Sequence, residues 1–228
     1  VSYAYIKQWS ESDARIRDMV MKMIADVMKT DQVTGRNLVI GDVIVRYVVK
    51  TLDRDREYLD EKNAGSMKIY GLEVPVRTLV GDQKIKGLVD RVDAVREGEI
   101  RVVDYKTGKV TEDDYNITDQ TYERIAAAIF EPDIDSRPSI AFQFFIYDLL
   151  LRSNGHDKDR QMKNSVYSMA GIFKESPVTM DFNEKFYGAV NIRLGETLGQ
   201  MYDPQIPFRR TANETTCSYC DFRNICGK

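Results

Sequence analysis

The sequence of 228 residues predicts an α/β fold in which α-helices flank one mixed β-sheet. The first observation is that residues 67–105 contain three runs of alternating apolar and polar residues, separated by short turns that contain glycine. Such runs are typical of neighbouring antiparallel strands. The second observation is that the apolar residues before and after this segment recur at helical spacing instead.

Two helices are predicted before the strands. The first follows the capping sequence Ser10–Asp13 and continues through regularly spaced apolar residues to about residue 29. The second covers residues 37–58. Residues 53–66 are strongly charged, which predicts a solvent-exposed helix end followed by a loop.

The elements after the strands complete the α/β pattern. A polar connection over residues 108–138 carries a short helix at 122–130, residues 139–152 form a buried helix, 166–173 a strand and 182–201 a last helix. The charged segment 155–164, which holds the single histidine His156, is predicted to be a surface loop. Because no linker interrupts this order, we expect one domain over residues 1–228, with a helical N-terminal part (1–66), a catalytic core (67–206) and a cysteine-containing tail (207–228).

The composition is that of a soluble globular protein. It combines 43% hydrophobic with 30% charged residues and a net charge of −3, which excludes disordered and collagen-like classes. No apolar run reaches the roughly 18–20 residues that span a bilayer. The first residues carry neither Met nor the features of a signal peptide, so we expect a fragment of a longer cytoplasmic protein. Three cysteines, an odd number, exclude a fully paired disulfide framework.

Two carboxylates and one lysine are predicted to converge on one patch of the sheet. Asp90 interrupts an apolar run, and Asp104 follows the apolar pair Val102–Val103. Side chains alternate between the two faces of a strand, so Asp104 and Lys106 share a face. The tight turn at residues 97–98 brings the strand of Asp90 beside that of Asp104.

This patch favours phosphodiester hydrolysis. Two neighbouring carboxylates repel each other unless a cation lies between them, and Mg²⁺ prefers carboxylate oxygens, waters and substrate phosphates. A lysine nearby can orient the attacking water or neutralise charge on the phosphate. An Asp-x-Lys sequence alone is usually an exposed ion pair on a strand. The combination of both aspartate motifs favours the metal site.

The two motifs together resemble the PD-(D/E)XK nuclease superfamily. They are Gly87-Leu-Val-Asp90-Arg-Val-Asp93 and Val102-Val-Asp104-Tyr-Lys106-Thr-Gly108, and they look like the RecB/AddB-type branch of helicase-associated nuclease domains. The resemblance implies a restriction-endonuclease-like core with Asp90, Asp104 and the carbonyl group of Tyr105 as ligands of Mg²⁺ or Mn²⁺. It implies Lys106 as the catalytic lysine.

A third motif agrees with this resemblance. Gln143 and Tyr147 lie on one face of the predicted buried helix, where the family places a Gln-x-x-x-Tyr pair beside the DNA or the metal. The alternative is a local hydrogen bond and ordinary packing. Residues 77–109 carry eight Lys or Arg against six acids, and we expect Arg91 and Lys109 to contact DNA phosphates.

The cysteines lie together near the C-terminal end. Cys217, Cys220 and Cys226 have the spacing of ligands to zinc or to an iron–sulfur cluster. The resemblance implies a [4Fe–4S] cluster in the intact parent protein, completed by a cysteine upstream of the nuclease core. This sequence lacks that fourth cysteine, and it also lacks the Gly-x-x-x-His helix that opens the family's core. A zinc-bound interaction module is the alternative.

The resemblance extends from about Gly71 to Lys228 and implies a metal-dependent DNA nuclease. We expect an exonuclease domain of an AddB/RecB-like recombinational repair protein, with DNA and a helicase subunit or domain as partners and no membrane contact. The alternative is a catalytically inactive nuclease fold that binds DNA or serves as a scaffold. Intact Asp90, Asp104 and Lys106 favour the enzyme.

Overall fold

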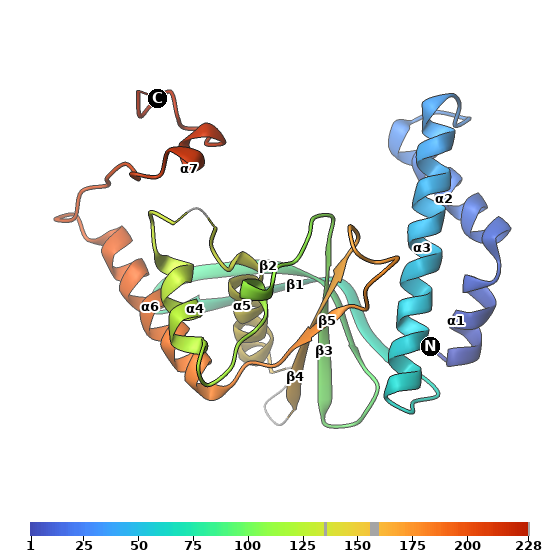
Figure 1. Ribbon diagram of the computed structural model, residues 1–228, viewed down its shortest axis with the longest axis horizontal. Coiled ribbons are helices and arrows are strands. Elements are labelled where there is room, and N and C mark those ends of the chain that lie inside the picture. Colours follow the sequence, from blue (N-terminus) through green and yellow to red (C-terminus); the bar gives the residue numbers. More distant parts are fainter. Residues whose placement is uncertain (135, 156–159, 228) are drawn as a thin grey trace. The chain divides into compact units, whose positions relative to one another are not determined.

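The protein is an α/β protein, as the sequence predicts. The computed structural model describes residues 1–134, 136–155 and 160–227. The elements in chain order are α1 (Tyr3–Ser10), α2 (Asp13–Met28), α3 (Arg36–Glu61), β1 (Lys68–Val80), β2 (Gln83–Ala94), β3 (Glu99–Lys106), the 3₁₀ helix η1 (Glu112–Asp114), α4 (Tyr122–Phe130), α5 (Ser139–Ser153), β4 (Gln161–Ser168), β5 (Val178–Met180), α6 (Glu184–Tyr202) and α7 (Glu214–Ser218) (Figure 1). In the part of the chain so described, no helix is long and apolar enough to cross a membrane.

The sheet is mixed, and its strands follow the order β1-β2-β3-β4-β5. Strands β2 and β3 are antiparallel, with Arg91 opposite Val103 and Asp93 opposite Arg101. Strands β3 and β4 are parallel, with Tyr105 beside Tyr167. The predicted meander of three strands is therefore confirmed, and the parallel strand β4 makes the sheet mixed.

The chain divides into two compact units. Unit 1 consists of Val1–Val74, Val89–Val110 and Asp159–Thr179, and unit 2 of Pro75–Leu88, Thr111–Lys158 and Met180–Lys228. Strands β1 and β2 each contribute residues to both units. The division into a helical part (1–66), a core (67–206) and a tail (207–228) of one domain stays a prediction.

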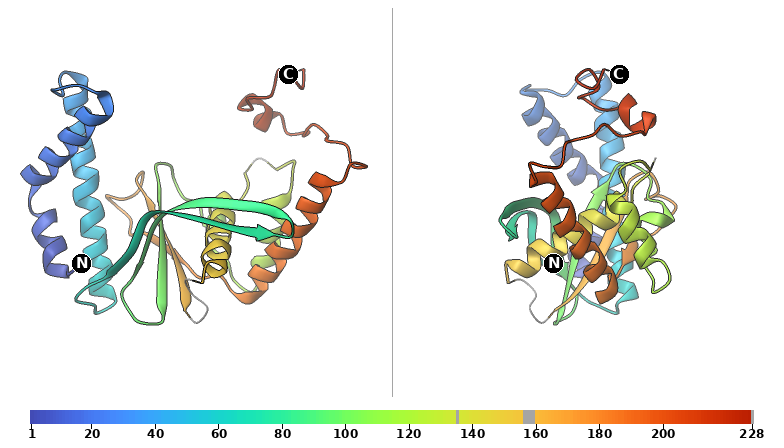
Figure 2. Two further views of the ribbon diagram at one scale, coloured as in Figure 1. Left: turned by 180° about the vertical axis from the view of Figure 1, so that it is seen from behind. Right: turned by 90° about the vertical axis from the view of Figure 1, so that its left-hand side faces the viewer.

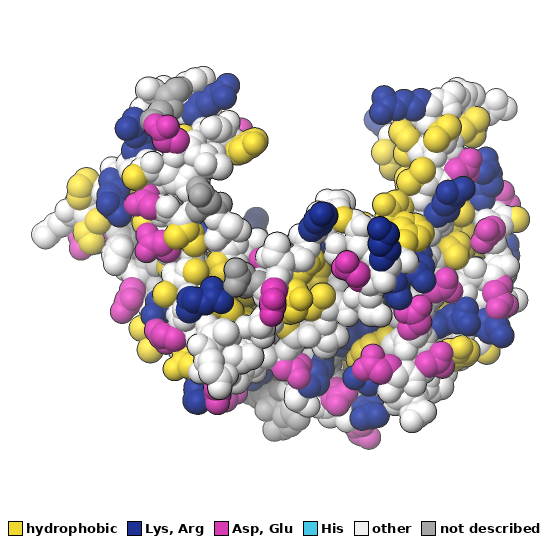
Figure 3. All heavy atoms as spheres, in the orientation of Figure 1, with side chains coloured by type: hydrophobic (Ala, Val, Ile, Leu, Met, Phe, Trp, Pro, Cys, Tyr) yellow, Lys and Arg dark blue, Asp and Glu magenta, His cyan; other side chains and the backbone are white. Residues whose placement is uncertain are grey.

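In unit 1, helices α1 and α2 pack beside the long helix α3 (Figure 2). Ile16 and Val20 of α2 are buried against Val45 of α3. Exposed apolar side chains continue along α2 and the first half of α3, and Figure 3 shows hydrophobic side chains gathered over these helices. They include Met23, Val27, Val39 and Val43.

The prediction that the second helix has a solvent-exposed end is wrong. Helix α3 continues to Glu61, and its last turns bury Arg54, Asp55 and Leu59. The buried charges are all paired, which removes most of the cost of burial. The Arg54 guanidinium donates to the carbonyl oxygen of Ile172 from both Nε, at 2.9 Å, and a terminal nitrogen, at 2.7 Å.

In unit 2, helices α4, α5 and α6 share one apolar core. Ile125 and Ala126 of α4, Phe145 of α5 and Phe186 of α6 belong to this core, and all are at most 1% exposed. Asn183 caps α6, since its side-chain oxygen accepts from the backbone N–H of Phe186 at 2.8 Å. The predicted helices at 122–130, 139–152 and 182–201 are confirmed within two residues.

The strand predicted at residues 166–173 is displaced in the structure. Strand β4 covers Gln161–Ser168, so that it begins within the predicted charged loop 155–164 and overlaps the predicted strand only at residues 166–168. Asn164 and Ser165 are buried within it, and these polar residues hide the apolar pattern of a strand. The short elements α1, β5 and α7 have no counterpart among the predicted elements. His156 lies outside the described residues.

Candidate active site

The antiparallel strands β2 and β3 separate the motif residues onto two faces. The register ends with the pair Arg91 and Val103, and the next residues along the two strands are Asp90 and Asp104. Residues directly opposite each other point to the same face. Asp90 and Asp104 therefore share one face, and Arg91 points to the other.

On the first face, the acids lie beside the lysine. The Lys106 Nζ atom is 2.9 Å from Asp104 Oδ2, and the Asp104 side chain is only 2% exposed. Asp90 is half-buried, and its Oδ2 atom accepts from the backbone N–H of Tyr105 at 2.9 Å. The structure thus brings Asp104 and Lys106 together, as the strand period predicts, and joins Asp90 to the residue between them.

The donor set of this face fits a hard divalent cation. Asp90 and Asp104 offer carboxylate oxygens from two adjacent strands, and Mg²⁺ is commonly bound by one or two carboxylates together with waters and substrate phosphates. Among residues 1–134, 136–155 and 160–227, no group of three or more His, Cys, Asp or Glu could hold a metal ion. A metal here would therefore depend on further oxygen atoms from the backbone, from water or from substrate.

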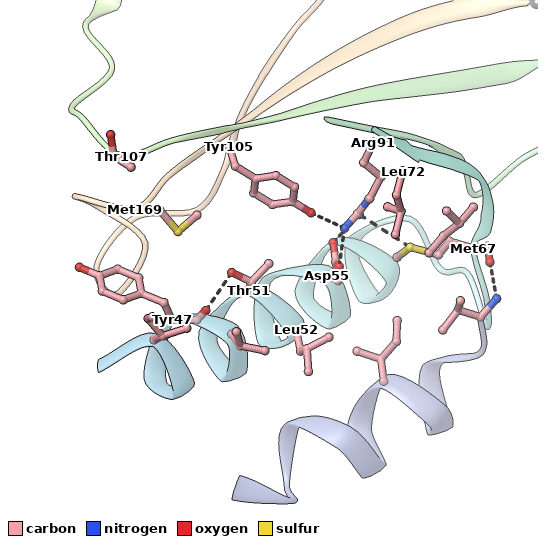
Figure 4. A pocket seen from close by; sticks show the side chains of 15 residues that line it. Tyr47, Thr51, Leu52, Asp55, Met67, Leu72, Arg91, Tyr105, Thr107 and Met169 are labelled. Carbon is pink, nitrogen blue, oxygen red and sulfur yellow. Dashed lines mark hydrogen bonds and ion pairs between the residues drawn. The ribbon is translucent and has the colours of Figure 1, made fainter. Parts of the chain in front are cut away.

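The opposite face carries a buried network of charges, centred on Arg91. The Arg91 guanidinium donates to both carboxylate oxygens of Asp55 in α3, at 2.7 and 2.8 Å. Its Nε donates to Asp93 at 2.6 Å, and a terminal nitrogen donates to the Tyr105 hydroxyl at 2.9 Å. The side chains of Arg91, Asp55 and Tyr105 are shown in Figure 4, where they line an apolar pocket of about 650 Å³.

The network extends to strand β4 through two further side chains. Arg101 donates to both oxygens of Asp93, at 2.8 and 2.9 Å. The Tyr167 hydroxyl donates to Asp55 Oδ1 at 2.7 Å. We call Asp55, Arg91, Asp93, Arg101, Tyr105 and Tyr167 the buried charge network. Two acids balance two arginines, so that no net charge is buried.

The surroundings shift the pKa values of the network in opposite directions. Burial raises the pKa of Asp55, but the charge of Arg91 and its hydrogen bonds outweigh burial and leave the pKa below the usual 3.8. Burial raises the pKa of the Tyr105 hydroxyl, and the same cause raises that of Tyr167. At neutral pH Asp55 is therefore ionised, Arg91 and Arg101 are charged, and the hydroxyls of Tyr105 and Tyr167 are neutral.

Arg91 corrects one expectation from the sequence. The sequence predicts that it contacts DNA, but its side chain is only 4% exposed and three neighbours occupy its guanidinium. It is not available to a phosphate. Lys109 is exposed, in keeping with the expected contact.

Asp55, Arg101 and Tyr167 are the network residues that sequence reasoning missed. Asp55 lies in a row with Val45, Leu52 and Leu59 at helical spacing along α3. A charged residue in an apolar row of a helix indicates a buried ion pair, and this signal could have identified Asp55. Tyr167 gave no comparable signal.

Gln143 and Tyr147 belong to helix α5 in unit 2. Gln143 Nε2 donates to the Tyr147 hydroxyl at 2.6 Å, so the two side chains share one helix face, as the sequence predicts. Helix α5 packs on strand β2 at Gly87, where an added Cβ atom would lie 3.1 Å from Leu150 Cδ1 and 3.7 Å from the Tyr147 ring. Gly87 thus permits the close approach of this helix.

The cysteine tail contains the short helix α7. Cys217 lies in α7, Cys220 just after it, and all three cysteines are free thiols. Cys226 is exposed, and Arg210 donates to its carbonyl oxygen at 3.4 Å. The role of Cys217, Cys220 and Cys226 as cluster ligands stays a prediction.

Comparison with known proteins identifies the family of the chain. The family model of the PD-(D/E)XK nuclease superfamily matches residues 6–227, which include most of α1, all of α2 and α3, and the motif strands. No curated protein matches the chain. The mixed sheet and its flanking helices agree with a restriction-endonuclease-like fold. The chain belongs to the PD-(D/E)XK nuclease superfamily.

Proposed function

We propose that the protein is a metal-dependent deoxyribonuclease that hydrolyses phosphodiester bonds. The observation that carries this proposal is the ion pair of Lys106 with the buried Asp104, on the face of β2 and β3 that also presents Asp90. We further propose that the domain acts as an exonuclease within an AddB/RecB-like recombinational repair protein, with a helicase subunit or domain as partner.

Each residue of the first face has a distinct proposed role. Asp90, Asp104 and the carbonyl group of Tyr105 would hold Mg²⁺ or Mn²⁺. The bound ion would supply an activated water and stabilise negative charge on the phosphate. Lys106 is partly exposed beside Asp104, so its ammonium group can reach a substrate phosphate and stabilise the charge that develops there.

The remaining predicted residues have supporting roles in this proposal. Lys109 is an exposed candidate for phosphate contact, and Gln143 and Tyr147 are candidates for contact with DNA or with groups around the metal. Cys217, Cys220 and Cys226 would hold a [4Fe–4S] cluster in the intact parent protein. Three free thiols are compatible with a reducing compartment, and we propose a cytoplasmic location.

The test is cleavage of end-labelled linear DNA, single- and double-stranded, in the presence of Mg²⁺. Asp90→Asn, Asp104→Asn and Lys106→Gln should each lower the rate by at least about 100-fold, since the first two remove charge from a proposed metal ligand and the third removes a charge that acts at the reacting phosphate. Asp82→Asn and Lys84→Gln are matched controls, because both residues are exposed and lie outside the site. They should keep the wild-type rate.

The same assay separates the enzyme from the scaffold alternative. Wild-type protein that binds the labelled DNA without cutting it, with either Mg²⁺ or Mn²⁺, would contradict the enzyme and favour a binding domain. Products that shorten from one labelled end would support the exonuclease mode, whereas cutting of circular DNA would contradict it.

A further inference from the structure

Tyr105 connects the two faces of the strand pair. Its backbone N–H donates to Asp90 on the first face, at 2.9 Å. Its hydroxyl accepts from Arg91 in the buried charge network on the other face, at 2.9 Å. Tyr105 also stands between Asp104 and Lys106 along β3. Any shift of its backbone would therefore move the groups of the first face.

The buried charge network provides a firm anchor for this residue. Arg91 is held by both oxygens of Asp55 and by Asp93, and these three residues are at most 5% exposed. Hydrogen bonds between ions are short and strong, and a network whose members are all paired is rigid. Asp55 lies in α3, so the anchor also joins this helix to the strands.

We propose that Tyr105 is a positioning residue, which transmits the fixed position of Arg91 and Asp55 to the carboxylates of the first face. The hydroxyl of Tyr105 fixes the ring, and the ring fixes the backbone segment whose N–H orients Asp90. This inference rests on the proposed function, because it concerns the metal affinity of Asp90 and Asp104. It assigns a supporting role to the face opposite the proposed metal site.

The structure offers a matched pair of variants to test this role. Tyr167 is the parallel partner of Tyr105 on β4, and the two rings lie 5.5 Å apart, centre to centre. Both hydroxyls belong to the same network, since Tyr167 donates to Asp55 at 2.7 Å. The motif residues Asp104 and Lys106 flank only Tyr105. Tyr105→Phe and Tyr167→Phe therefore each remove one buried hydroxyl from the network, at different places.

The experiment measures the Mn²⁺ dissociation constant of the full chain by calorimetry and the urea midpoint of unfolding. Partners that orient metal ligands typically contribute a factor of about ten or more to metal affinity. We expect Tyr105→Phe to raise the dissociation constant about tenfold and Tyr167→Phe to raise it less than about twofold. The two urea midpoints should fall by similar amounts. Equal dissociation constants in the two variants would overturn the positioning role.

A second readout follows the orientation of Asp90 directly. Hydrogen exchange of the Tyr105 backbone N–H should become faster in Tyr105→Phe than in Tyr167→Phe at matched stability, because the partner of this N–H is Asp90. Unchanged exchange in Tyr105→Phe would contradict the inference even if metal binding cannot be measured in that variant. Wild-type protein without any Mn²⁺ affinity would instead contradict the proposed function, on which the inference depends.

Discussion

At the scale of single residues, the alternation of side chains along a strand decides which motif residues can act together. The sequence alone predicts that Asp104 and Lys106 share a face, because they lie two positions apart along β3, with only Tyr105 between them. The same rule assigns Arg91 to the other face, away from Asp90. Its burial could not be predicted, since it depends on Asp55 from a distant helix.

Asp55 makes the stability of the protein sensitive to acid. Its pKa is lower in the folded protein than the ordinary 3.8. A group with a lowered folded pKa contributes stability above its unfolded pKa, and this contribution is lost as the pH falls through the folded pKa. We therefore expect the free energy of unfolding to decrease below about pH 4 as Asp55 becomes protonated.

The double variant Asp55→Asn/Arg91→Gln tests this dependence without leaving one buried charge unpaired. Urea unfolding between pH 5 and pH 2 should give a shallower dependence on pH than in the wild type, by up to about 1.4 kcal/mol per pH unit. The exposed control Asp82→Asn should keep the wild-type dependence. Identical slopes in the wild type and the double variant would contradict the role of Asp55.

At the scale of elements, apolar periodicity predicts the helices well and the strand β4 poorly. Helices α4, α5 and α6 bury regular apolar rows, which are visible in the sequence. Strand β4 buries Asn164 and Ser165 instead, and its place beside β3 depends on pairing with a partner far away in sequence. Strand propensity and apolar pattern are properties of a short stretch of sequence, so they cannot identify a strand whose formation depends on a distant partner.

Gly87 provides a test of the packing of α5 on β2. A Cβ atom there would approach Leu150 to 3.1 Å, and larger side chains would push the helix away. Gly87→Leu should lower the free energy of unfolding by about 1–3 kcal/mol, as overpacking does, and urea unfolding measures the loss.

Gly195→Ala in α6 is the matched control for Gly87→Leu, since open space surrounds its Cβ position. This change should raise stability by up to about 1 kcal/mol, because alanine favours a helix more than glycine does. Tolerance of Gly87→Leu without loss would show that α5 does not pack closely on this strand.

At the scale of the whole molecule, the match to the family model covers more of the chain than the motifs do. The motif residues lie between Gly87 and Tyr147, whereas the family match begins at residue 6. Helices α1 to α3 carry no nuclease motif, yet α3 supplies Asp55 to the buried charge network. The motifs could therefore predict the family and the candidate metal ligands, but not the part of the chain that supports them.

Mn²⁺ titration calorimetry of the full chain tests whether Asp90 and Asp104 form a metal site. Wild-type protein should bind Mn²⁺ with measurable heat, and Asp104→Asn should lose this binding, because it removes one of two ligand carboxylates. Asp93→Asn is not a suitable control, since Asp93 is buried in the network; Asp82→Asn should bind as the wild type does. Equal Mn²⁺ binding by the wild type and by Asp104→Asn would contradict the assignment of Asp104 as a metal ligand.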